Sequence, residues 1–397
     1  MKPNVLFLLK GLNTGGLEVV TSVLANKFVA EGHGVSVFSF LGGKPSVADR
    51  FNSRIKVYRQ NDYSNSKENI ARLRQVLIDD RIGIIINQWG LPLIPIRVAK
   101  SAVAGLDIKI ISVYHNAPSF NGRIQKLRIA LSDVGSPMRS AFLHVKMWMF
   151  KEVTRRAMRY IYEQSDAFLV LSNGYTDEFM RFTRLKETPK LHVLTNPVTV
   201  NSEDFEYEEC KKCNEIIYVG RLDFVQKRVY RVIDTWNYLE EQFPDWSLTI
   251  VGDGEDRINL ENHVKALGLK RVSFEGFRKP DDYYRRASIL ILTSDFEGFP
   301  LVIPECMSFG VIPVVYDSYA AVGDIIENGK DGIVVPFQEK GYKAYEAATM
   351  VAGIMENERK RGSMAVAAIE KSKSYSVDEI YKKWMELIIT LYCNEKA

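Results

Sequence analysis

The stretch Asp295-Phe-Glu-Gly-Phe-Pro-Leu-Val-Ile-Pro-Glu305 decides how this chain is interpreted. It follows an apolar run, 288–293, that is typical of a buried strand, and it leads into a helical pattern that ends at Gly310. Two carboxylates, Glu297 and Glu305, therefore flank a Gly-Phe-Pro turn between a strand and a helix. In open α/β sheets, ligands bind at this edge. Glu305 has apolar neighbours, so its carboxylate needs a hydrogen-bond partner, and a pair of sugar hydroxyls would serve.

A structural role for the two glutamates is an equal alternative when the stretch is taken alone. Glu297 would then be a favourable negative charge at a helix start, and Glu305 would be partly exposed. The rest of the chain decides between these interpretations.

The chain length and composition indicate a two-domain globular protein. Its 397 residues exceed what one hydrophobic core usually supports. Hydrophobic residues make up 46% and charged residues 26%, which is ordinary for a soluble protein. Four cysteines are too few for a disulfide framework, and no apolar run approaches the roughly 20 residues of a spanning helix. The first residues are typical of a strand rather than a signal peptide, so we expect a cytoplasmic protein.

Charge divides the chain at Asn196. Residues 1–196 hold 28 Lys and Arg against 15 Asp and Glu, a balance of +13, whereas residues 197–397 hold 25 against 34, a balance of −9. The basic first half suggests an anionic partner, such as a membrane surface or a phosphate-bearing substrate, although a merely solvated basic surface is nearly as common. No feature indicates a nucleic-acid partner.

Apolar runs alternate with helical patterns in both halves, which predicts two parallel sheets. In the first half the expected strands are 4–10, 35–40, 55–58, 82–87, 108–114, 167–171 and 191–194, with helical patterns at 19–30, 65–80, 92–104 and from 175 onward. In the second half they are 216–219, 247–251, 272–275, 288–293, 312–315 and 332–335, with helical patterns at 227–243, 301–309, 341–372 and 377–392 and a further one that ends at 267. The fold class is therefore α/β, with two Rossmann-like, doubly wound domains.

Two features of the first half lie at strand ends. Gly15 and Gly16 precede a helical pattern, and without side chains they allow a ligand to approach the backbone closely. The Gly-x-Gly-x-x-Gly spacing of dinucleotide-binding proteins is missing. His115 ends the strand at 108–114, where it is placed to contact a substrate, although a histidine bonding its own turn is about as common.

Two cations follow the first strand of the second half. Gly220 and Arg221 leave that strand, and Lys227 is expected to open the next helix. A guanidinium fork and an ammonium at a glycine turn make a diphosphate clamp plausible. The alternative is a pair of exposed surface cations.

Residues 119–164 depart from the regular alternation. The insert 119–136 is loosely helical and basic, and its Arg123, Lys126 and Arg128 make it a candidate for contact with an acceptor or a membrane. Residues 138–164 carry an apolar stripe at helical spacing. A helix lying on anionic lipid is one interpretation. We favour the other, a domain helix that buries its stripe in the core.

Taken together, these motifs resemble the family-four, group 1 retaining glycosyltransferases, which use nucleotide sugars and have the two-domain GT-B fold. The matches occur in order at Gly15-Gly16, His115, Asn196-Pro197, Gly220-Arg221, Lys227, Glu297 and Glu305. The resemblance implies an N-terminal acceptor-side domain at 1–196 and a nucleotide-sugar-binding domain at 197–375. It also implies a final helix, within 376–397, that packs back on the first domain.

The resemblance also assigns roles to residues. It implies that Glu305 holds the ribose, that Glu297 and His115 lie near the donor sugar, and that Arg221 and Lys227 neutralise the leaving diphosphate. We expect these residues except Glu305 to serve catalysis. The remaining donor-binding residues that it implies are Gly15, Gly16 and Gly220 at the phosphates, Phe277 and Arg278 at the base, and Phe299, Pro300 and Leu301 at the sugar and phosphates.

The implied activity is transfer of a sugar, with retention of configuration, from a UDP-sugar to a hydroxyl of a glycan or lipid-linked acceptor in bacterial surface polysaccharide or lipopolysaccharide synthesis. No metal or cofactor is expected, because no Asp-x-Asp loop occurs, and peripheral contact with the inner face of the cell membrane is expected. The alternatives are a GDP-mannose-dependent mannosyltransferase, an epimerase or phosphorylase of the same architecture, and a catalytically silent nucleotide-sugar-binding module. The intact clamp and both glutamates argue against the last.

Overall fold

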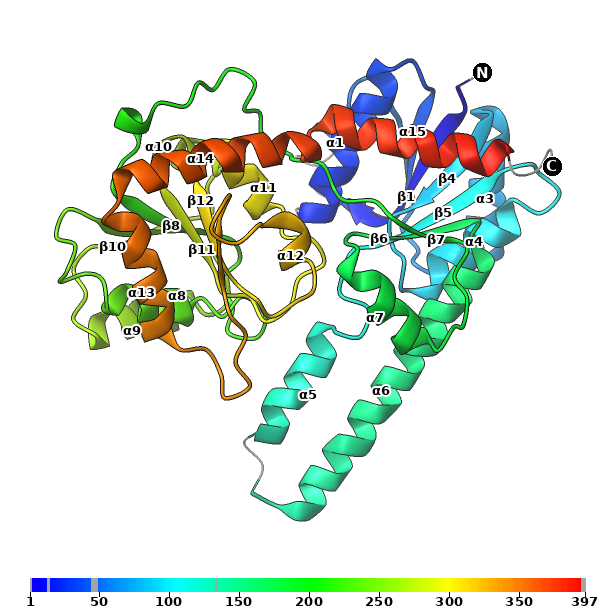
Figure 1. The fold of residues 1–397 in the computed structure, drawn as a ribbon. Helices are drawn as coiled ribbons and strands as arrows, with labels where there is room; N and C mark the ends of the chain where they lie inside the picture. The colour runs from blue at the N-terminus through cyan, green and yellow to red at the C-terminus, as the bar shows by residue number, and fades with distance from the viewer. Residues whose placement is uncertain (1, 13–14, 44–48, 133–134, 394–397) are drawn as a thin grey trace. The chain divides into compact units, whose positions relative to one another are not determined.

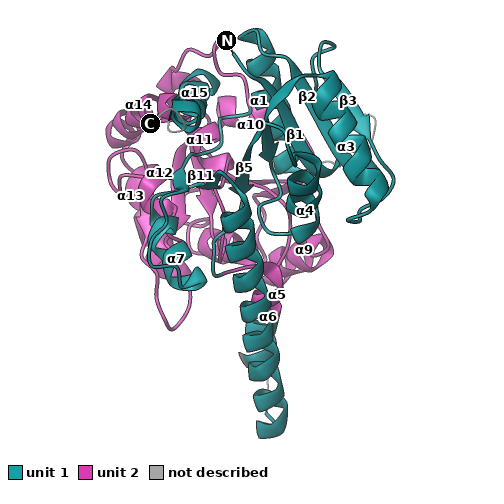
Figure 2. Cartoon of the chain, turned by 90° about the vertical axis from the view of Figure 1, so that its right-hand side faces the viewer, with its two compact units in different colours: residues 1–119, 127–199, 376–397 teal, residues 120–126, 200–375 magenta. Residues whose placement is uncertain are grey.

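Two separate parallel sheets organise the chain, each in its own compact unit. The computed structural model describes residues 2–12, 15–43, 49–132 and 135–393. Unit 1 comprises residues 1–119, 127–199 and 376–397, and unit 2 comprises residues 120–126 and 200–375 (Figure 2). Unit 2 is therefore inserted between the body of unit 1 and its last helix, and it also takes in the short segment 120–126.

Unit 1 contains a seven-stranded sheet in the order β3-β2-β1-β4-β5-β6-β7, with every pair parallel (Figure 1). Its strands are β1 (Asn4–Leu12), β2 (Val35–Gly43), β3 (Lys56–Arg59), β4 (Ile82–Asn87), β5 (Lys109–Tyr114), β6 (Ala167–Val170) and β7 (Leu191–Val193). All seven predicted strands are present. The interior strand β1 is apolar without alternation from Val5 to Leu9 and is buried there, as expected for a strand covered on both faces.

The helices that accompany this sheet in the chain are α1 (Gly16–Ala30), α3 (Lys67–Asp79), α4 (Leu93–Ala102), α6 (Pro137–Gln164), α7 (Gly174–Thr183) and the final α15 (Val377–Cys393). A further helix, α5 (Gly122–Ser132), begins in the segment that groups with unit 2. α15 packs against α1, where the rings of Phe28 and Tyr381 lie 5.2 Å apart at a steep angle. Near the end of α15, the Tyr392 hydroxyl donates a hydrogen bond of 3.0 Å to the carbonyl of Gly83.

The prediction that 138–164 buries its apolar stripe is wrong for most of its length. α6 has 28 residues and is therefore about 42 Å long, and it extends well beyond the sheet of unit 1 (Figures 1 and 2). Met158, Ile161 and Tyr162 are buried near its carboxyl end, where it packs on α4 and α7. The apolar residues in the first half of α6 are exposed because this part of the helix extends beyond the body of unit 1.

Unit 2 contains a six-stranded parallel sheet in the order β10-β9-β8-β11-β12-β13. The strands are β8 (Glu215–Val219), β9 (Ser247–Val251), β10 (Val272–Gly276), β11 (Ile289–Leu292), β12 (Ile312–Tyr316) and β13 (Ile333–Val335). The helices are α8 (Tyr230–Asn237), α9 (Arg257–Ala266), α10 (Asp281–Arg286), α11 (Val302–Met307), α12 (Val322–Ile325), α13 (Ala344–Met355) and α14 (Glu358–Ser372). The predicted class, two doubly wound α/β domains, is confirmed.

The acidic segment 201–209 packs partly on the rest of unit 2. The Phe205 ring lies 5.1 Å from that of Phe309, and the Tyr207 ring lies so close to Gly310 that an added Cβ would come within 2.5 Å of it. Among the described residues, no helix is both long enough and apolar enough to cross a membrane.

Candidate functional site

The point where strand order reverses locates the candidate site in unit 2. β8 lies between β9 and β11, so the connections from these neighbours leave in opposite directions and open a crevice at their carboxyl ends. Gly220 and Arg221 follow β8, and Glu297 lies in the loop that follows β11. The motifs that are 76 residues apart in the sequence thus meet at one edge of the sheet.

Close backbone contact between two turns shapes this edge. Gly252, with φ of 144°, follows β9, and a Cβ at this position would lie only 1.8 Å from the carbonyl oxygen of Gly220. A Cβ at Gly254 would lie 2.2 Å from the carbonyl oxygen of Leu222. Glycine is needed at both positions because no side chain fits between the turns. The Leu222 amide also donates to the Asp253 carbonyl over 3.0 Å, which locks the Arg221 turn in place.

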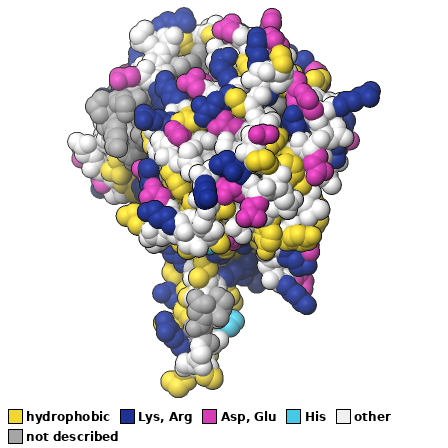
Figure 3. Space-filling model, turned by 90° about the vertical axis from the view of Figure 1, so that its left-hand side faces the viewer, with side chains coloured by type: hydrophobic (Ala, Val, Ile, Leu, Met, Phe, Trp, Pro, Cys, Tyr) yellow, Lys and Arg dark blue, Asp and Glu magenta, His cyan; other side chains and the backbone are white. Residues whose placement is uncertain are grey.

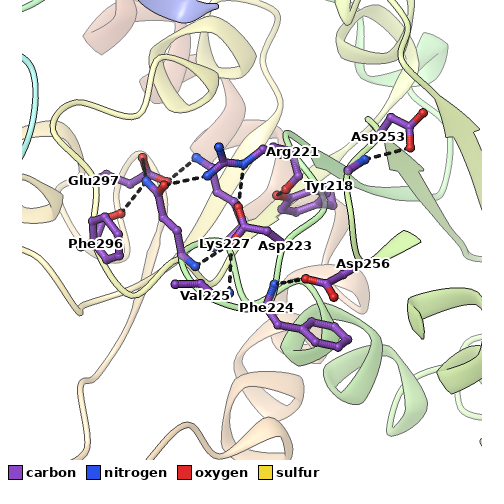
Figure 4. A network of polar contacts seen from close by, with 12 residues as sticks. Tyr218, Arg221, Asp223, Phe224, Val225, Lys227, Asp253, Asp256, Phe296 and Glu297 are labelled. Carbon is purple, nitrogen blue, oxygen red and sulfur yellow. Dashed lines mark hydrogen bonds and ion pairs between the residues drawn. The ribbon is translucent and has the colours of Figure 1, made fainter. Parts of the chain in front are cut away.

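Asp223 organises the cation-bearing turn from within (Figure 4). Its Oδ1 accepts hydrogen bonds from the backbone amides of Val225, Gln226 and Lys227, at 3.1, 2.6 and 3.1 Å. Its Oδ2 accepts from Nε of Arg221 at 2.7 Å. Burial alone would raise the pKa of Asp223, but these amides and the guanidinium outweigh it and lower the pKa below its ordinary value. Asp223 is therefore a charged anchor at neutral pH.

Lys227 and Glu297 form an ion pair that is largely shielded from solvent (Figure 4). The Lys227 ammonium binds Glu297 Oε1, and the two side chains are 18% and 9% exposed. Gln226 Nε2 donates to Glu297 Oε2 at 3.2 Å and to the Phe296 carbonyl at 3.0 Å. Two predicted site residues thus lie in direct contact. Lys227 lies in a turn and not, as predicted, at a helix start, since α8 begins only at Tyr230.

A second ion-pair cluster holds the loop before Glu297. Asp295 accepts from Arg228 Nε at 2.7 Å and from Arg231 Nη1 at 2.6 Å. Arg228 has φ of 52°, in the left-handed region that non-glycine residues seldom occupy. The sequence pattern did not single out these residues, because the contacts join segments more than 60 residues apart. They fix the Asp295–Glu297 loop against the cationic turn.

Glu305 lies in α11 and is 6% exposed. Its Oε2 accepts a long hydrogen bond of 3.4 Å from the hydroxyl of Tyr284, a buried residue of α10. Burial, together with the charge of Glu305, raises the pKa of Tyr284 well above its ordinary value, so the phenol stays protonated and can donate. Glu305 is therefore buried and hydrogen-bonded, as predicted, and Tyr284 is one of its partners.

The other predicted donor-binding residues of unit 2 lie on the same edge of the sheet in different settings. Arg221 is 62% exposed, and Phe277 and Arg278 are exposed after β10. Phe299 is buried in the turn before α11. Pro300 has no amide hydrogen, so of the turn 299–301 only the amides of Phe299 and Leu301 can donate to a phosphate.

In unit 1, the predicted residues also lie at strand ends. Gly15 caps α1 in an extended conformation, and Oε2 of Glu18 lies where a Cβ of Gly15 would be, within 2.7 Å. His115 follows β5, and its Nε2 lies 2.7 Å from Oε1 of Gln88 after β4. Burial lowers the pKa of His115 well below its ordinary value, so its imidazole is neutral at physiological pH. A neutral imidazole that donates from Nε2 keeps Nδ1 as an acceptor.

Lys10 is a residue that the sequence pattern did not reveal. It lies near the end of β1, beside the point where the strand order of this sheet reverses, and its ammonium lies 5.0 Å from the ring centre of Tyr63 and 5.6 Å from that of Trp89. The only hint in the sequence is that Lys10 ends the first expected strand, 4–10.

Arg123, Lys126 and Arg128 are exposed on α5, whereas Ile124, Gln125 and Leu127 of the same helix are buried. Exposed cations and buried residues thus alternate along this part of α5. Arg123 and Lys126 belong to the segment of α5 that groups with unit 2, and Arg128 to the part that groups with unit 1.

Comparison with known families matches nearly the whole chain. A family model described as "Glycosyl transferases group 1" matches residues 200–371, and one described as "Glycosyltransferase Family 4" matches residues 14–202. The first match covers the site of unit 2, and the second covers the basic half with Gly15, Gly16 and His115.

Individual relatives agree with these matches. A Campylobacter jejuni protein named GalNAc-alpha-(1->4)-GalNAc-alpha-(1->3)-diNAcBac-PP-undecaprenol alpha-1,4-N-acetyl-D-galactosaminyltransferase is 25% identical over 391 residues, which cover 96% of this chain and 97% of that protein. The amylovoran biosynthesis glycosyltransferase AmsD of Erwinia amylovora is 27% identical over 251 residues, 62% of this chain and 68% of that protein. The structure of Anabaena Alr3699/HepE, in complex with UDP and glucose, matches with a TM-score of 0.73 at 17% identity and covers 98% of this chain and 100% of that one. This last likeness concerns the fold.

Proposed function

The chain belongs to the group 1, family-four glycosyltransferases, and we propose that it transfers a sugar from a UDP-sugar to a hydroxyl of a bacterial surface glycan. The observation that carries this proposal is the contact of Lys227 with Glu297, and of both with Gln226 beside Arg221, at the strand-order reversal of unit 2, with Glu305 in the helix that follows the Glu297 loop. Two cations and two carboxylates at one such edge match the two halves of a nucleotide sugar. The cations suit the diphosphate, and the carboxylates suit the hydroxyls of the ribose and the sugar.

The main chemical demand of this reaction is to stabilise the leaving diphosphate. As the bond between the anomeric carbon and the β-phosphate oxygen breaks, its electron pair passes to that oxygen. The acceptor hydroxyl oxygen bonds to the carbon and passes its proton to the departing phosphate oxygen. Arg221 and Lys227 stabilise the negative charge that develops on the phosphate, without a metal ion. The turn that Asp223 and the glycines hold rigid keeps both cations in position before the reaction begins.

Lys227 has two partners in this scheme. Its ammonium is held by Glu297, and three ammonium hydrogens allow it to bind a phosphate oxygen as well. Glu297 in turn orients Lys227 and accepts from a sugar hydroxyl. Glu305 holds the ribose hydroxyls in place of, or together with, Tyr284. Retention of the anomeric configuration is part of the proposal, and it is checked on the product.

We propose that the acceptor is a lipid-linked glycan that approaches unit 1. The relative from Campylobacter jejuni is named for a PP-undecaprenol-linked acceptor. The balance of +13 in the basic half, and the exposed Arg123, Lys126 and Arg128 of α5, suit the anionic groups of such a molecule or of the membrane around it. Lys10, between Tyr63 and Trp89, suits an acidic group or a sugar ring of the acceptor.

A donor screen tests the proposal. UDP-glucose, UDP-galactose, UDP-N-acetylgalactosamine and GDP-mannose are compared by thermal shift, and the stabilising donors are then assayed for transfer to lipid-linked glycans, with the anomeric configuration of the product read by NMR. Stabilisation by a UDP-sugar and transfer with retention are expected. Stronger stabilisation by GDP-mannose would favour the alternative, a GDP-mannose-dependent mannosyltransferase. The absence of a thermal shift with every nucleotide sugar would contradict the proposal. UDP-glucose is tried first because the structural relative from Anabaena holds UDP and glucose.

A further inference from the structure

The first half of α6 exposes a continuous apolar stripe, which we call the α6 stripe. Its six side chains are each 55–85% exposed: Met138, Phe142, Val145, Trp148, Met149 and Val153. Five of them follow the spacing i, i+4, i+7, i+11 and i+15 and therefore lie along one line of the helix, with Trp148 beside them. Large apolar side chains gathered in this way on a globular protein mark an interaction surface.

The fold of unit 1 does not cover the α6 stripe. Of the residues from Pro137 to Ala157, only Leu143 is buried, while the packing of α6 on α4 and α7 involves its later part, where Met158 and Ile161 are buried. The stripe runs over 16 residues, from Met138 to Val153, which is about 22 Å of helix. It is thus a long, narrow and nearly straight apolar surface.

Basic side chains accompany the α6 stripe, and acidic ones do not. From Pro137 to Lys151 the helix carries Arg139, Lys146 and Lys151 and no Asp or Glu. The whole segment 119–151 has six Lys and Arg against one Asp. Figure 3 shows apolar and basic side chains together on the part of the molecule that extends downward in that view. The first acidic residue of α6, Glu152, is already paired with Arg155 and Arg156.

We propose that the α6 stripe seats the protein on an anionic lipid surface. Apolar residues with Trp and Phe on one face and cations beside them are the composition of helices that lie in the headgroup region. The centre of a protein interface is usually depleted in lysine, so Lys146 and Lys151 favour a lipid partner over a second copy of the chain. The inference rests on the proposed function, because a lipid-linked acceptor is presented at such a surface. It assigns the anchor to α6, separately from the α5 cations.

Vesicle binding of the full chain tests the proposal without an activity assay. Vesicles of phosphatidylglycerol in phosphatidylcholine are compared with pure phosphatidylcholine by co-sedimentation. We expect binding to the anionic vesicles that weakens as salt is raised. The double variant Phe142→Ser/Trp148→Ser should lower the partition coefficient by about tenfold or more, and Lys146→Gln/Lys151→Gln by a comparable factor at low salt.

Exposed apolar side chains elsewhere supply the matched control. Ile258 on α9 and Val366 on α14 are 72% and 58% exposed, so Ile258→Ser/Val366→Ser removes similar apolar surface away from α6. This variant should bind vesicles as the wild type does. All variants should keep the wild-type Tm, because each substituted side chain is exposed. A wild type that remains in the supernatant at low salt, or equal losses in the control and α6 variants, would overturn the proposal.

Two further readouts separate lipid contact from self-association of the chain. The emission of Trp148 should shift to the blue on anionic vesicles, and the shift should disappear in Trp148→Phe. Sedimentation velocity without lipid should give the same species for the wild type and Phe142→Ser/Trp148→Ser; a wild-type dimer that this variant dissociates would assign the stripe to a second copy instead. Transfer to a soluble acceptor, measured on the same variants, should be unchanged. If none of these proteins transfers a sugar although vesicle binding is as expected, the result contradicts the proposed function. The role of α6 as a membrane anchor is then unaffected.

Discussion

Gln125 Nε2 donates a hydrogen bond of 2.6 Å to Oδ2 of Asp295, the carboxylate that also binds Arg228 and Arg231. Gln125 belongs to the first turns of α5, and it is buried. Beside this bond, the rings of Phe120 and Phe296 lie 5.1 Å apart. The basic insert is thus attached directly to the loop that carries Glu297.

We therefore expect Gln125→Glu to lower turnover, because a carboxylate at 125 repels Asp295 and displaces the Glu297 loop. The destabilisation should be on the order of 1–3 kcal/mol, and Gln125→Met, which only removes the hydrogen bond, should cost less. Gln75→Glu on α3 is the matched control, since Gln75 is exposed and donates to Asp79. Kinetics and thermal unfolding of the three variants measure this. Equal effects of Gln125→Glu and Gln75→Glu would show that the contact with Asp295 does not position the loop.

Arg221→Ala should lower turnover with only a small loss of Tm, because Asp223 keeps its three backbone amide donors. The guanidinium is mostly exposed, so little packing is lost, but the leaving diphosphate loses a charged partner worth about 2–5 kcal/mol. Arg221→Lys should recover only part of the rate, because lysine lacks the planar fork. Lys330→Ala, which removes an exposed lysine paired with Glu327, is the control. Wild-type kinetics in Arg221→Ala would remove this residue from the clamp.

Lys227→Ala should lower both turnover and stability. The change removes the second phosphate partner and also leaves the shielded carboxylate of Glu297 without its cation. The double variant Lys227→Ala/Glu297→Gln should recover stability but not turnover. Calorimetric unfolding and steady-state kinetics on both variants separate the two effects. If the double variant recovers turnover as well, Lys227 acts only by balancing the charge of Glu297.

The two glutamates should differ in their effect on nucleotide binding. Glu305→Ala should weaken the binding of free UDP, because we assign its carboxylate to the ribose, by about 1.5–3 kcal/mol for a hydrogen bond to a charged group. Glu297→Ala should leave UDP affinity close to that of the wild type and lower turnover. Titration calorimetry with UDP on both variants is the measurement. Normal UDP binding by Glu305→Ala would contradict the ribose assignment.

His33 should make the stability of unit 1 depend on pH. It is buried between β1 and α15, where Nδ1 donates to the Pro3 carbonyl at 2.7 Å and Nε2 accepts from the Tyr381 hydroxyl at 2.9 Å. Burial lowers the pKa of His33, so the unfolded chain binds the proton more readily than the folded one. Stability is therefore full above the unfolded pKa and falls as pH drops below it. The difference in Tm between wild type and His33→Gln should narrow between about pH 7 and pH 5. A difference that stays constant over this range would contradict the prediction.

Local sequence pattern was sufficient for the strands and for the edge of the sheet where the site lies. β1 and β4 are apolar runs with clear ends, so the positions of Gly15, Gly220 and Glu297 at strand ends could be derived from the chain alone. The ion pairs of Asp295 could not, because Arg228 and Arg231 reach it across the fold. The start of α8 could not be derived either. The amides of residues 225–227 donate hydrogen bonds to Asp223, and these bonds hold Lys227 in a turn before the helix.

The α6 stripe shows a different limit. Its spacing predicted a helix with an apolar face, and the helix is present. Periodicity alone states that one face is apolar and does not state what covers it. Met138 and Met158 belong to the same helix, yet the first is 85% exposed and the second is fully buried, because only the end near Met158 reaches the other helices of the unit.

The return of α15 to unit 1 also has a consequence for biosynthesis. A ribosome releases the chain from its amino end, so the β-sheet of unit 1 emerges first, but the face of α1 around Phe28 and His33 stays uncovered until Tyr381 has been made. All residues of unit 2 precede α15 in the chain. Unit 2 can therefore complete its folding during translation before α15 is made, whereas unit 1 is completed only after all of unit 2 has been synthesised.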